Sequence, residues 1–151
     1  MKRIPVISIR AVRERSIPYS EVPECRSPGD AAEFLREWIG EEDREHFVVL
    51  CLNTKHRINA VHTVSIGSLN ASLAHPREVF KAAIATNAST IIVAHNHPSG
   101  EATPSPEDVA VTQRLVMAGK ILGIEVLDSL IVTGSDEYVS LRSRGLVDFC
   151  A

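Results

Sequence analysis

This chain has few cysteines, no long apolar run and no excess of positive charge, and each shortage excludes a class of protein. Its 151 residues include three cysteines, an odd number with no Cys-x-x-Cys pair, so neither a disulfide framework nor a thiolate zinc site is indicated. No apolar run reaches the roughly 18 residues of a membrane span, and no signal peptide is recognised. We therefore expect a cytoplasmic protein of one domain that does not contact a membrane.

The missing positive charge bears on nucleic-acid binding. A formal net charge of −3 gives no global attraction to nucleic acid. The first fifteen residues are a local exception, because five basic side chains there accompany Glu14 alone. This segment is either a phosphate-contacting arm or a solvated N-terminal stretch, and we favour the second interpretation. The basic residues are Lys2, Arg3, Arg10, Arg13 and Arg15.

Hydrophobic residues make up 44% of the chain, and their spacing predicts interleaved helices and strands. The stretch SPGDAAEFLREWIG predicts a helix, with Ser27 as its cap, Asp30 completing a capping box and Gly40 at its end. Further helices are expected at 75–86, with Val79, Phe80, Ala83 and Ile84 on its apolar side, and from Ser105 to near Gly119 or Gly123. Strands are expected at 46–53, 58–67, 89–95, 124–134 and 137–142, with one more at 4–9.

This order of elements is typical of an α/β fold. We expect three α/β/α layers around a mixed sheet. Residues 1–26 are interpreted as an N-terminal arm and residues 27–151 as the domain.

Two histidines one residue apart follow the strand expected near residues 90–94. Residues i and i+2 of an extended segment face the same side, so His95 and His97 can reach one ion. Asp108 falls in the first turn of the next helix and faces back toward the end of that strand. Two imidazoles and a carboxylate suit a divalent ion such as zinc and leave a fourth position for water. That arrangement is typical of a hydrolytic site.

Each of these residues also has a purely structural interpretation. A single histidine at the end of a strand is most often a satisfied polar residue. Ser105 and Asp108, with Pro106 between them, form a normal capping box, and Asp108 taken alone is best explained that way. The metal site is favoured because the three residues together lie on the elements that would bring them into contact.

The stretch HNHPSGEATPSPED matches the pattern of the JAMM (MPN-type) metalloproteases, which is His-x-His, seven residues, Ser, two residues, Asp. With EHFVVLCLNTKHRI, GSLNASLAHPREVFKAAIATNAS and EYVSLRSRGL, it resembles the RadC family over about residues 30–147. The resemblance implies a cytidine-deaminase-like fold and a zinc ion held by His95, His97 and Asp108. It also implies that Ser105 steadies the oxyanion of a tetrahedral intermediate.

The family pattern further requires an upstream glutamate that activates water. Glu45, immediately before the strand 46–52, matches the expected position and would take a proton from zinc-bound water and return it to the leaving amine. Glu78 is the alternative, although its place at a helix start also favours a structural role. We favour Glu45 and interpret the nearby Glu41, Glu42 and Asp43 as solvent-facing charges.

The chain departs from the family at two points. Asp128-Ser129 stands where RadC-like sequences usually have Asp-His, so we expect no site role for this strand. The helix-hairpin-helix region of longer RadC proteins is missing, so no DNA-binding module is expected and a DNA-repair role gains no support from these residues.

Two classes of function follow. The first is a zinc-dependent hydrolase, a metallopeptidase or isopeptidase acting on a peptide or protein substrate. The second is a non-catalytic metal-binding interaction module linked to DNA repair or mobile elements. Phosphodiester cleavage is chemically allowed, but no phosphate-binding loop accompanies the site, and neither an HNH nuclease finger nor a deaminase motif is present. Specificity would come from the flanking surfaces 53–57, 67–75 and 99–104, and no pattern there names a substrate or an oligomeric state.

Overall fold

One five-stranded mixed sheet organises the fold, which the computed structural model describes over residues 1–67 and 74–150. The strand order is β2-β1-β3-β4-β5, in which only β3 and β4 run parallel. The strands are β1 (His46–Leu52), β2 (Ile58–Ile66), β3 (Thr90–Asn96), β4 (Glu125–Val132) and β5 (Tyr138–Ser140). The helices are α1 (Pro28–Ile39), α2 (Pro76–Ala85) and α3 (Pro106–Leu122). All lie close to their predicted positions.

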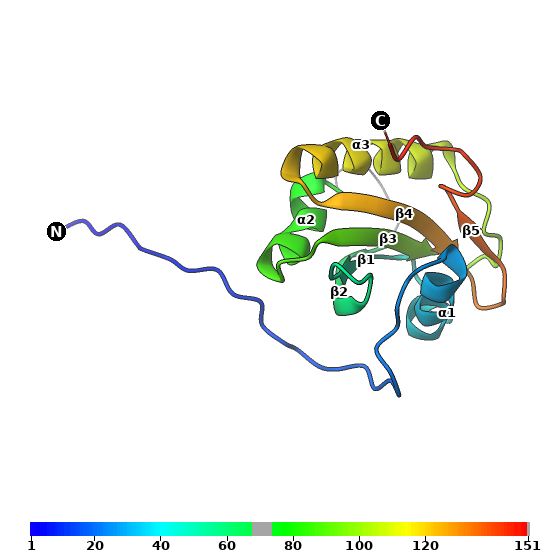
Figure 1. Ribbon diagram of the computed structural model, residues 1–151, viewed down its shortest axis with the longest axis horizontal. Helices are drawn as coiled ribbons and strands as arrows, with labels where there is room; N and C mark the ends of the chain where they lie inside the picture. Colours follow the sequence, from blue (N-terminus) through cyan, green and yellow to red (C-terminus); the bar gives the residue numbers. More distant parts are fainter. Residues whose placement is uncertain (68–73, 151) are drawn as a thin grey trace.

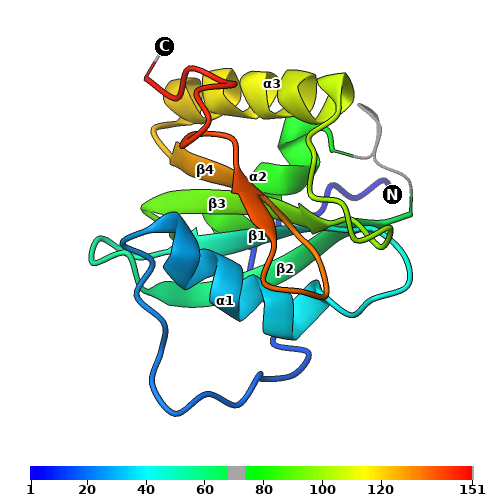
Figure 2. The same ribbon diagram turned by 90° about the vertical axis from the view of Figure 1, so that its right-hand side faces the viewer.

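Helices cover both faces of the sheet, so the predicted α/β fold with three layers is confirmed. Figures 1 and 2 show α2 and α3 on one face and α1 on the other. One core cluster lies under α2 and α3 and includes Phe80 and Leu115, and a second lies under α1 and includes Leu35 and Leu50. The central strands β1 and β3 read as continuous apolar runs because both of their faces are buried. None of the described helices is long and apolar enough to cross a membrane.

The connection from β3 to β4 runs through α3, as a parallel pair requires. The helix ends at Gly123, whose φ of +73° is a left-handed conformation that glycine adopts without strain. Gly119, the other predicted end, lies inside the helix. A Cβ atom there would stand 2.4 Å from the Ile124 carbonyl oxygen, so this glycine allows close packing of the helix on the chain that follows it.

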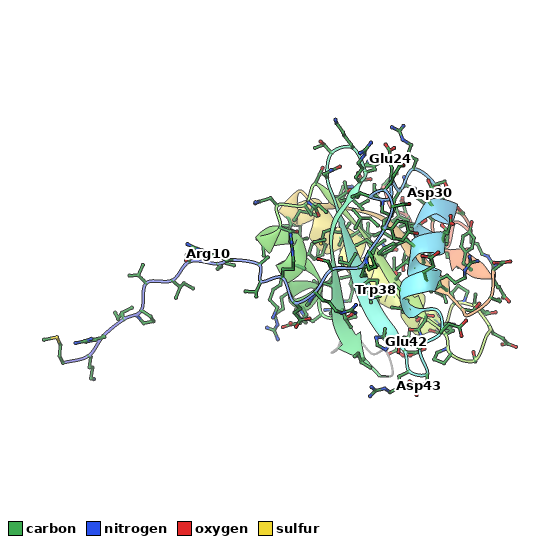
Figure 3. All side chains as sticks on the ribbon, turned by 90° about the horizontal axis from the view of Figure 1, so that it is seen from below. Arg10, Glu24, Asp30, Trp38, Glu42 and Asp43 are labelled. Atoms are coloured by element: carbon green, nitrogen blue, oxygen red, sulfur yellow. The ribbon has the colours of Figure 1, made fainter. Side chains whose placement is uncertain are left out.

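Two local predictions were wrong. Residues 4–9 form no strand, because in this structure the segment runs through solvent away from the sheet and has no neighbouring strand for a backbone ladder (Figure 1). Figure 3 shows Arg10, just after this stretch, on the extended N-terminal segment outside the packed domain. Ile84 is 54% exposed, whereas Val79, Phe80 and Ala83 on the same helix are buried as expected.

The folded part of the chain extends into the predicted arm. Glu24 forms an antiparallel bridge with Arg57, next to a hydrogen bond from the Cys25 N–H to the His56 carbonyl at 2.8 Å. Cys25 itself is buried in the core cluster under α1. Residues 23–25 therefore pair with residues 56–58, which lead into β2.

Candidate metal centre

The end of β3 holds the two histidines on the face of the sheet that α2 and α3 cover. His95 is 2% exposed and stacks on Phe47, with ring centroids 6.1 Å apart. His97 follows the strand, and its N–H donates to the Val132 carbonyl at 2.9 Å, which continues the pairing with β4 by one residue. The alternation of an extended chain then directs both imidazoles to the same side. Their Nε2 atoms lie 3.0 Å apart.

The first turn of α3 supplies the carboxylate. The Ser105 N–H donates to Asp108 Oδ2 at 2.8 Å, and the Asp108 N–H donates to Ser105 Oγ at 3.1 Å. The other oxygen, Oδ1, lies 3.2 Å from His95 Nε2. The helix cap, one of the two roles that we had weighed for Asp108, is therefore observed, and it leaves Oδ1 directed at His95, where it could also contact an ion.

The three side chains fit a tetrahedral divalent ion. Zinc bonds of about 2.0–2.2 Å to nitrogen and oxygen separate neighbouring ligand atoms by about 3.3–3.6 Å. The histidine nitrogens are 3.0 Å apart, Asp108 Oδ1 lies 3.2 Å from His95 Nε2, and Oδ2, which also accepts the Ser105 N–H, lies 3.6 Å from His97 Nε2. One ligand atom from each residue lies within 4.8 Å of the other two. Among residues 1–67 and 74–150, His95, His97 and Asp108 form a group of three side chains that could hold a metal ion. Three protein ligands leave a further position for water, as in catalytic zinc sites.

A backbone carbonyl fixes the tautomer of His97. Its Nδ1 lies 2.8 Å from the Glu101 carbonyl oxygen. Because a carbonyl only accepts, Nδ1 carries the proton, and the Nε2 lone pair of the neutral ring is left for an ion. Outer-shell contacts of this kind are usual around metal-binding histidines. The Glu101 carbonyl could not be identified from the sequence, because side-chain motifs carry no signal for a backbone acceptor.

The charges of the cluster also favour a cation. Burial alone would raise the pKa of the Asp108 carboxyl, but hydrogen bonds from His95 and His97 lower that pKa well below its usual range. The hydrogen bond to Asp108 raises the pKa of His97, against the opposing effect of burial. A buried carboxylate that stays ionised beside two imidazoles is a strong site for a divalent cation.

The candidate general bases differ in position. Glu45, immediately before β1, has its Oε1 3.9 Å from His97 Nε2. The Gly67 N–H donates to the Glu45 carbonyl at 2.8 Å. Glu78 instead lies on α2, where it forms an ion pair with Lys81 at 2.7 Å, and it does not line the cleft over the histidines. The geometry therefore favours Glu45 over Glu78, and its catalytic role stays a prediction.

A cleft of about 720 Å³ opens over the cluster. Its lining includes Glu45, His97, Ser105 and Asp108, so the predicted base, two ligands and the motif serine share one space. Ser105 Oγ accepts the Asp108 N–H, which leaves the hydroxyl hydrogen available to a group in the cleft. Of the flanking surfaces that we predicted for specificity, residues 68–73 lie outside the described part of the chain.

Other residues with metal-binding side chains have structural roles. His75 caps α2 by accepting the Arg77 N–H at Nδ1, as expected for a histidine at a helix start. Burial raises the pKa of the Cys25 thiol to about 11 and also raises that of Cys51, so neither thiol is a ready metal ligand.

The strand β4 supports the site indirectly. Ser129 Oγ lies 3.0 Å from the Thr112 hydroxyl, which donates to the Asp108 carbonyl at 2.9 Å. The side chain at this departure from the family pattern thus contacts the helix turn that carries Asp108. Its neighbour Asp128 accepts hydrogen bonds from the Ser140 hydroxyl at 2.5 Å and the Arg142 N–H at 3.2 Å, which anchors the C-terminal segment.

Comparison with known proteins identifies the family of the chain. Residues 25–146 match the family model of the RadC-like JAB domain. A UPF0758 protein of Caldanaerobacter subterraneus subsp. tengcongensis is 56% identical over 123 residues, which cover 82% of this chain and 52% of that protein. A UPF0758 protein of Chloroflexus aggregans is 51% identical over 144 residues (92% and 62%), and one of Desulforamulus reducens is 50% identical over 122 residues (81% and 53%).

The chain therefore belongs to the RadC-like JAB domain family, and the predicted resemblance is confirmed. It spans about half the length of the first two curated relatives, 52% and 62%.

Proposed function

We propose that this RadC-like JAB domain is a zinc-dependent hydrolase that cleaves an amide bond in a peptide or protein substrate, as a metallopeptidase or isopeptidase. The observation that supports the proposal is the cluster of His95, His97 and Asp108, of which His97 and Asp108 line an open cleft. A structural zinc site would be closed by a fourth protein ligand, whereas a catalytic site keeps one position open.

The side chains around the cleft supply the remaining chemistry. A bound zinc ion would polarise the substrate carbonyl and lower the pKa of its water to about 7. Glu45 accepts the proton of the attacking water and delivers it to the leaving amine, which needs the carboxylate within reach of both. The Ser105 hydroxyl donates a hydrogen bond to the oxyanion as the carbonyl carbon becomes tetrahedral. The capping box keeps Ser105 and Asp108 in a fixed relation during this change.

The test compares wild-type protein with Glu45→Gln on a library of internally quenched peptides and on an isopeptide-linked lysine substrate. We expect zinc content to be equal and hydrolysis by Glu45→Gln to fall by about 100- to 10,000-fold, the usual contribution of a general base. Glu78→Gln is the matched control, because it removes the same charge from an exposed position outside the cleft. Equal activity in wild type and Glu45→Gln would refute the assignment of the base. Zinc binding without hydrolysis by the wild type would favour the non-catalytic metal-binding module.

A further inference from the structure

The residue between the two histidines faces the opposite side of the sheet. Alternation along β3 directs Asn96 toward the layer of α1, as it does Ala94 and Ile92, which belong to the core cluster under that helix. Asn96 is 0% exposed. A fully buried amide needs hydrogen-bond partners for its oxygen and its nitrogen, because leaving them unpaired is costly.

Those partners are backbone groups of the connection between α1 and β1. Asn96 Oδ1 accepts the His46 N–H at 2.6 Å. Asn96 Nδ2 donates to the Arg44 carbonyl at 2.9 Å and to the Glu42 carbonyl at 3.4 Å. Figure 3 shows Glu42 and Asp43 at the end of α1, where this connection begins. The amide thus binds the peptide groups on both sides of Glu45.

These side-chain contacts continue the β1–β3 pairing by one residue beyond the last backbone pair. The pairing of β1 with β3 stops at Phe47 opposite His95. Beyond that pair, the Asn96 side chain takes the place of a strand partner for His46. On the other edge, the Gly67 N–H holds the Glu45 carbonyl at 2.8 Å. Glu45 is therefore in an irregular segment whose backbone is fixed from β2 on one side and from β3 on the other.

We propose that Asn96 is a positioning residue that sets the place of the Glu45 carboxylate relative to the ion held by His95 and His97. The proposal rests on the proposed function, because Glu45 matters here as the base of that reaction. The consecutive residues 95–97 give ligand, clamp and ligand on alternating faces, so one short stretch of β3 fixes both the metal and the segment that carries the base. A displacement of about 1 Å in such a group lowers the rate by about 100-fold.

The kinetic test uses Asn96→Ala, alone and combined with Glu45→Gln, on the peptide substrate found in the screen above. We expect zinc content to be unchanged, kcat to fall by about 10- to 100-fold and KM to change little. Because Asn96 acts through Glu45, its removal should cost nothing further in the Glu45→Gln protein. Additive losses in the double variant, or loss of zinc together with activity, would overturn the proposal.

Thr133→Ala is the matched control. Thr133 directly follows β4, is fully buried and also clamps backbone, since its Oγ1 donates to the Glu137 carbonyl at 3.1 Å and accepts the Ser135 N–H at 3.3 Å. It should leave kcat unchanged, because it does not line the cleft. If Asn96→Ala does not fold, Asn96→Asp keeps the size and the acceptor but loses both N–H donors, and the same pattern is expected from it.

Two measurements that do not depend on hydrolysis test the role of Asn96 separately from the proposed function. Hydrogen exchange of the peptide covering residues 42–47 should be faster in Asn96→Ala than in wild type, while the peptide covering 53–57 is unchanged. If the wild type cleaves no peptide, the proposed function fails, and cobalt-substituted protein decides the role of Asn96. A visible spectrum altered alike by Glu45→Gln and by Asn96→Ala supports positioning of Glu45 at the ion. A spectrum that responds to Glu45→Gln only, or unchanged exchange at 42–47, overturns it.

Discussion

Ser105 and Asp108 hold each other across the first turn of α3, each donating its backbone N–H to the side chain of the other, at 2.8 and 3.1 Å. The same reciprocal pair occurs at the start of α1 between Ser27 and Asp30, where no ligand cluster is present among the described residues. The two capping boxes have the same local chemistry. Comparing variants of the two therefore separates the effect of a cap on helix stability from its effect on the side chains of the cluster.

The first prediction uses that pair. Ser105→Ala and Ser27→Ala should each lower the free energy of unfolding by about 1 kcal/mol, because each removes one half of a capping box. Only Ser105→Ala should also reduce hydrolysis, by about 10-fold or more, since it removes the hydroxyl that we propose as the donor to the oxyanion. Urea unfolding and steady-state kinetics on both variants check this. An equal fall in activity in Ser27→Ala would mean that the loss comes from helix stability alone.

The second prediction concerns metal content. His97→Ala should bind no zinc when the wild type, purified without added metal, holds about one ion per chain, because two ligands cannot replace three in a tetrahedral site. His75→Ala removes a histidine whose role is to cap α2, and its zinc content should equal that of the wild type. Elemental analysis of the three proteins decides the matter. Zinc retained by a folded His97→Ala would place the ion elsewhere.

The third prediction is the pH dependence of the metal-free protein. The hydrogen bond to Asp108 raises the pKa of His97, so its stabilisation is fully present below 6.5 and is lost as pH rises through the folded value. Burial acts to raise the pKa of Asp108, but the histidine hydrogen bonds lower it, so its stabilisation is present above 3.8 and is lost as pH falls. Both contributions are complete between about 3.8 and 6.5, and the free energy of unfolding should decline from about pH 6 to pH 8.

Thermal unfolding in EDTA across this range gives the measurement. In the presence of zinc the slope should reverse, because protons compete with the ion for His95 and His97. Metal-free His97→Ala should lack the part of the decline that comes from His97. A metal-free wild type whose stability rises from pH 6 to pH 8 would contradict the charge pairing described here.

The fourth prediction concerns the anchor of the C-terminal segment. Asp128→Ala should lower the free energy of unfolding by about 1–3 kcal/mol, because it leaves the Ser140 hydroxyl and the Arg142 N–H without their buried acceptor. Zinc content should be unaffected, since Asp128 contacts none of the three ligands in the hydrogen bonds of the described residues. Urea unfolding with elemental analysis tests both parts, and loss of metal would show that β4 controls the site more directly.

Local chemistry explains which elements could be predicted from the sequence. The helix at residues 27–40 was predictable because Ser27, Asp30 and Gly40 act within one turn of their own positions. The proximity of His95, His97 and Asp108 was predictable for a similar reason, since a strand end and the following helix cap bring these side chains together by short-range geometry.

The failures involve contacts that are distant in the sequence or that depend on a partner. Residues 4–9 have the composition of a strand, but a strand forms only beside another strand. Asn96 bonds to backbone groups about 50 residues away in the sequence. Every residue carries such backbone groups, so the sequence contains no pattern that identifies these partners. The choice between cap and ligand for Asp108 could not be made from the sequence, because the carboxylate caps α3 through Oδ2 and still places Oδ1 3.2 Å from His95 Nε2.

The alternation of ligand, clamp and ligand along β3 also limits how this site can evolve. Inserting or deleting one residue within the strand would turn every following side chain to the other face. A length change before His95 would turn Asn96 toward the cleft and both histidines toward the apolar layer of α1. We therefore expect length changes in this family to be absent from β3 and to accumulate in surface connections such as residues 53–57, so that the site diversifies by substitution around a strand of fixed length.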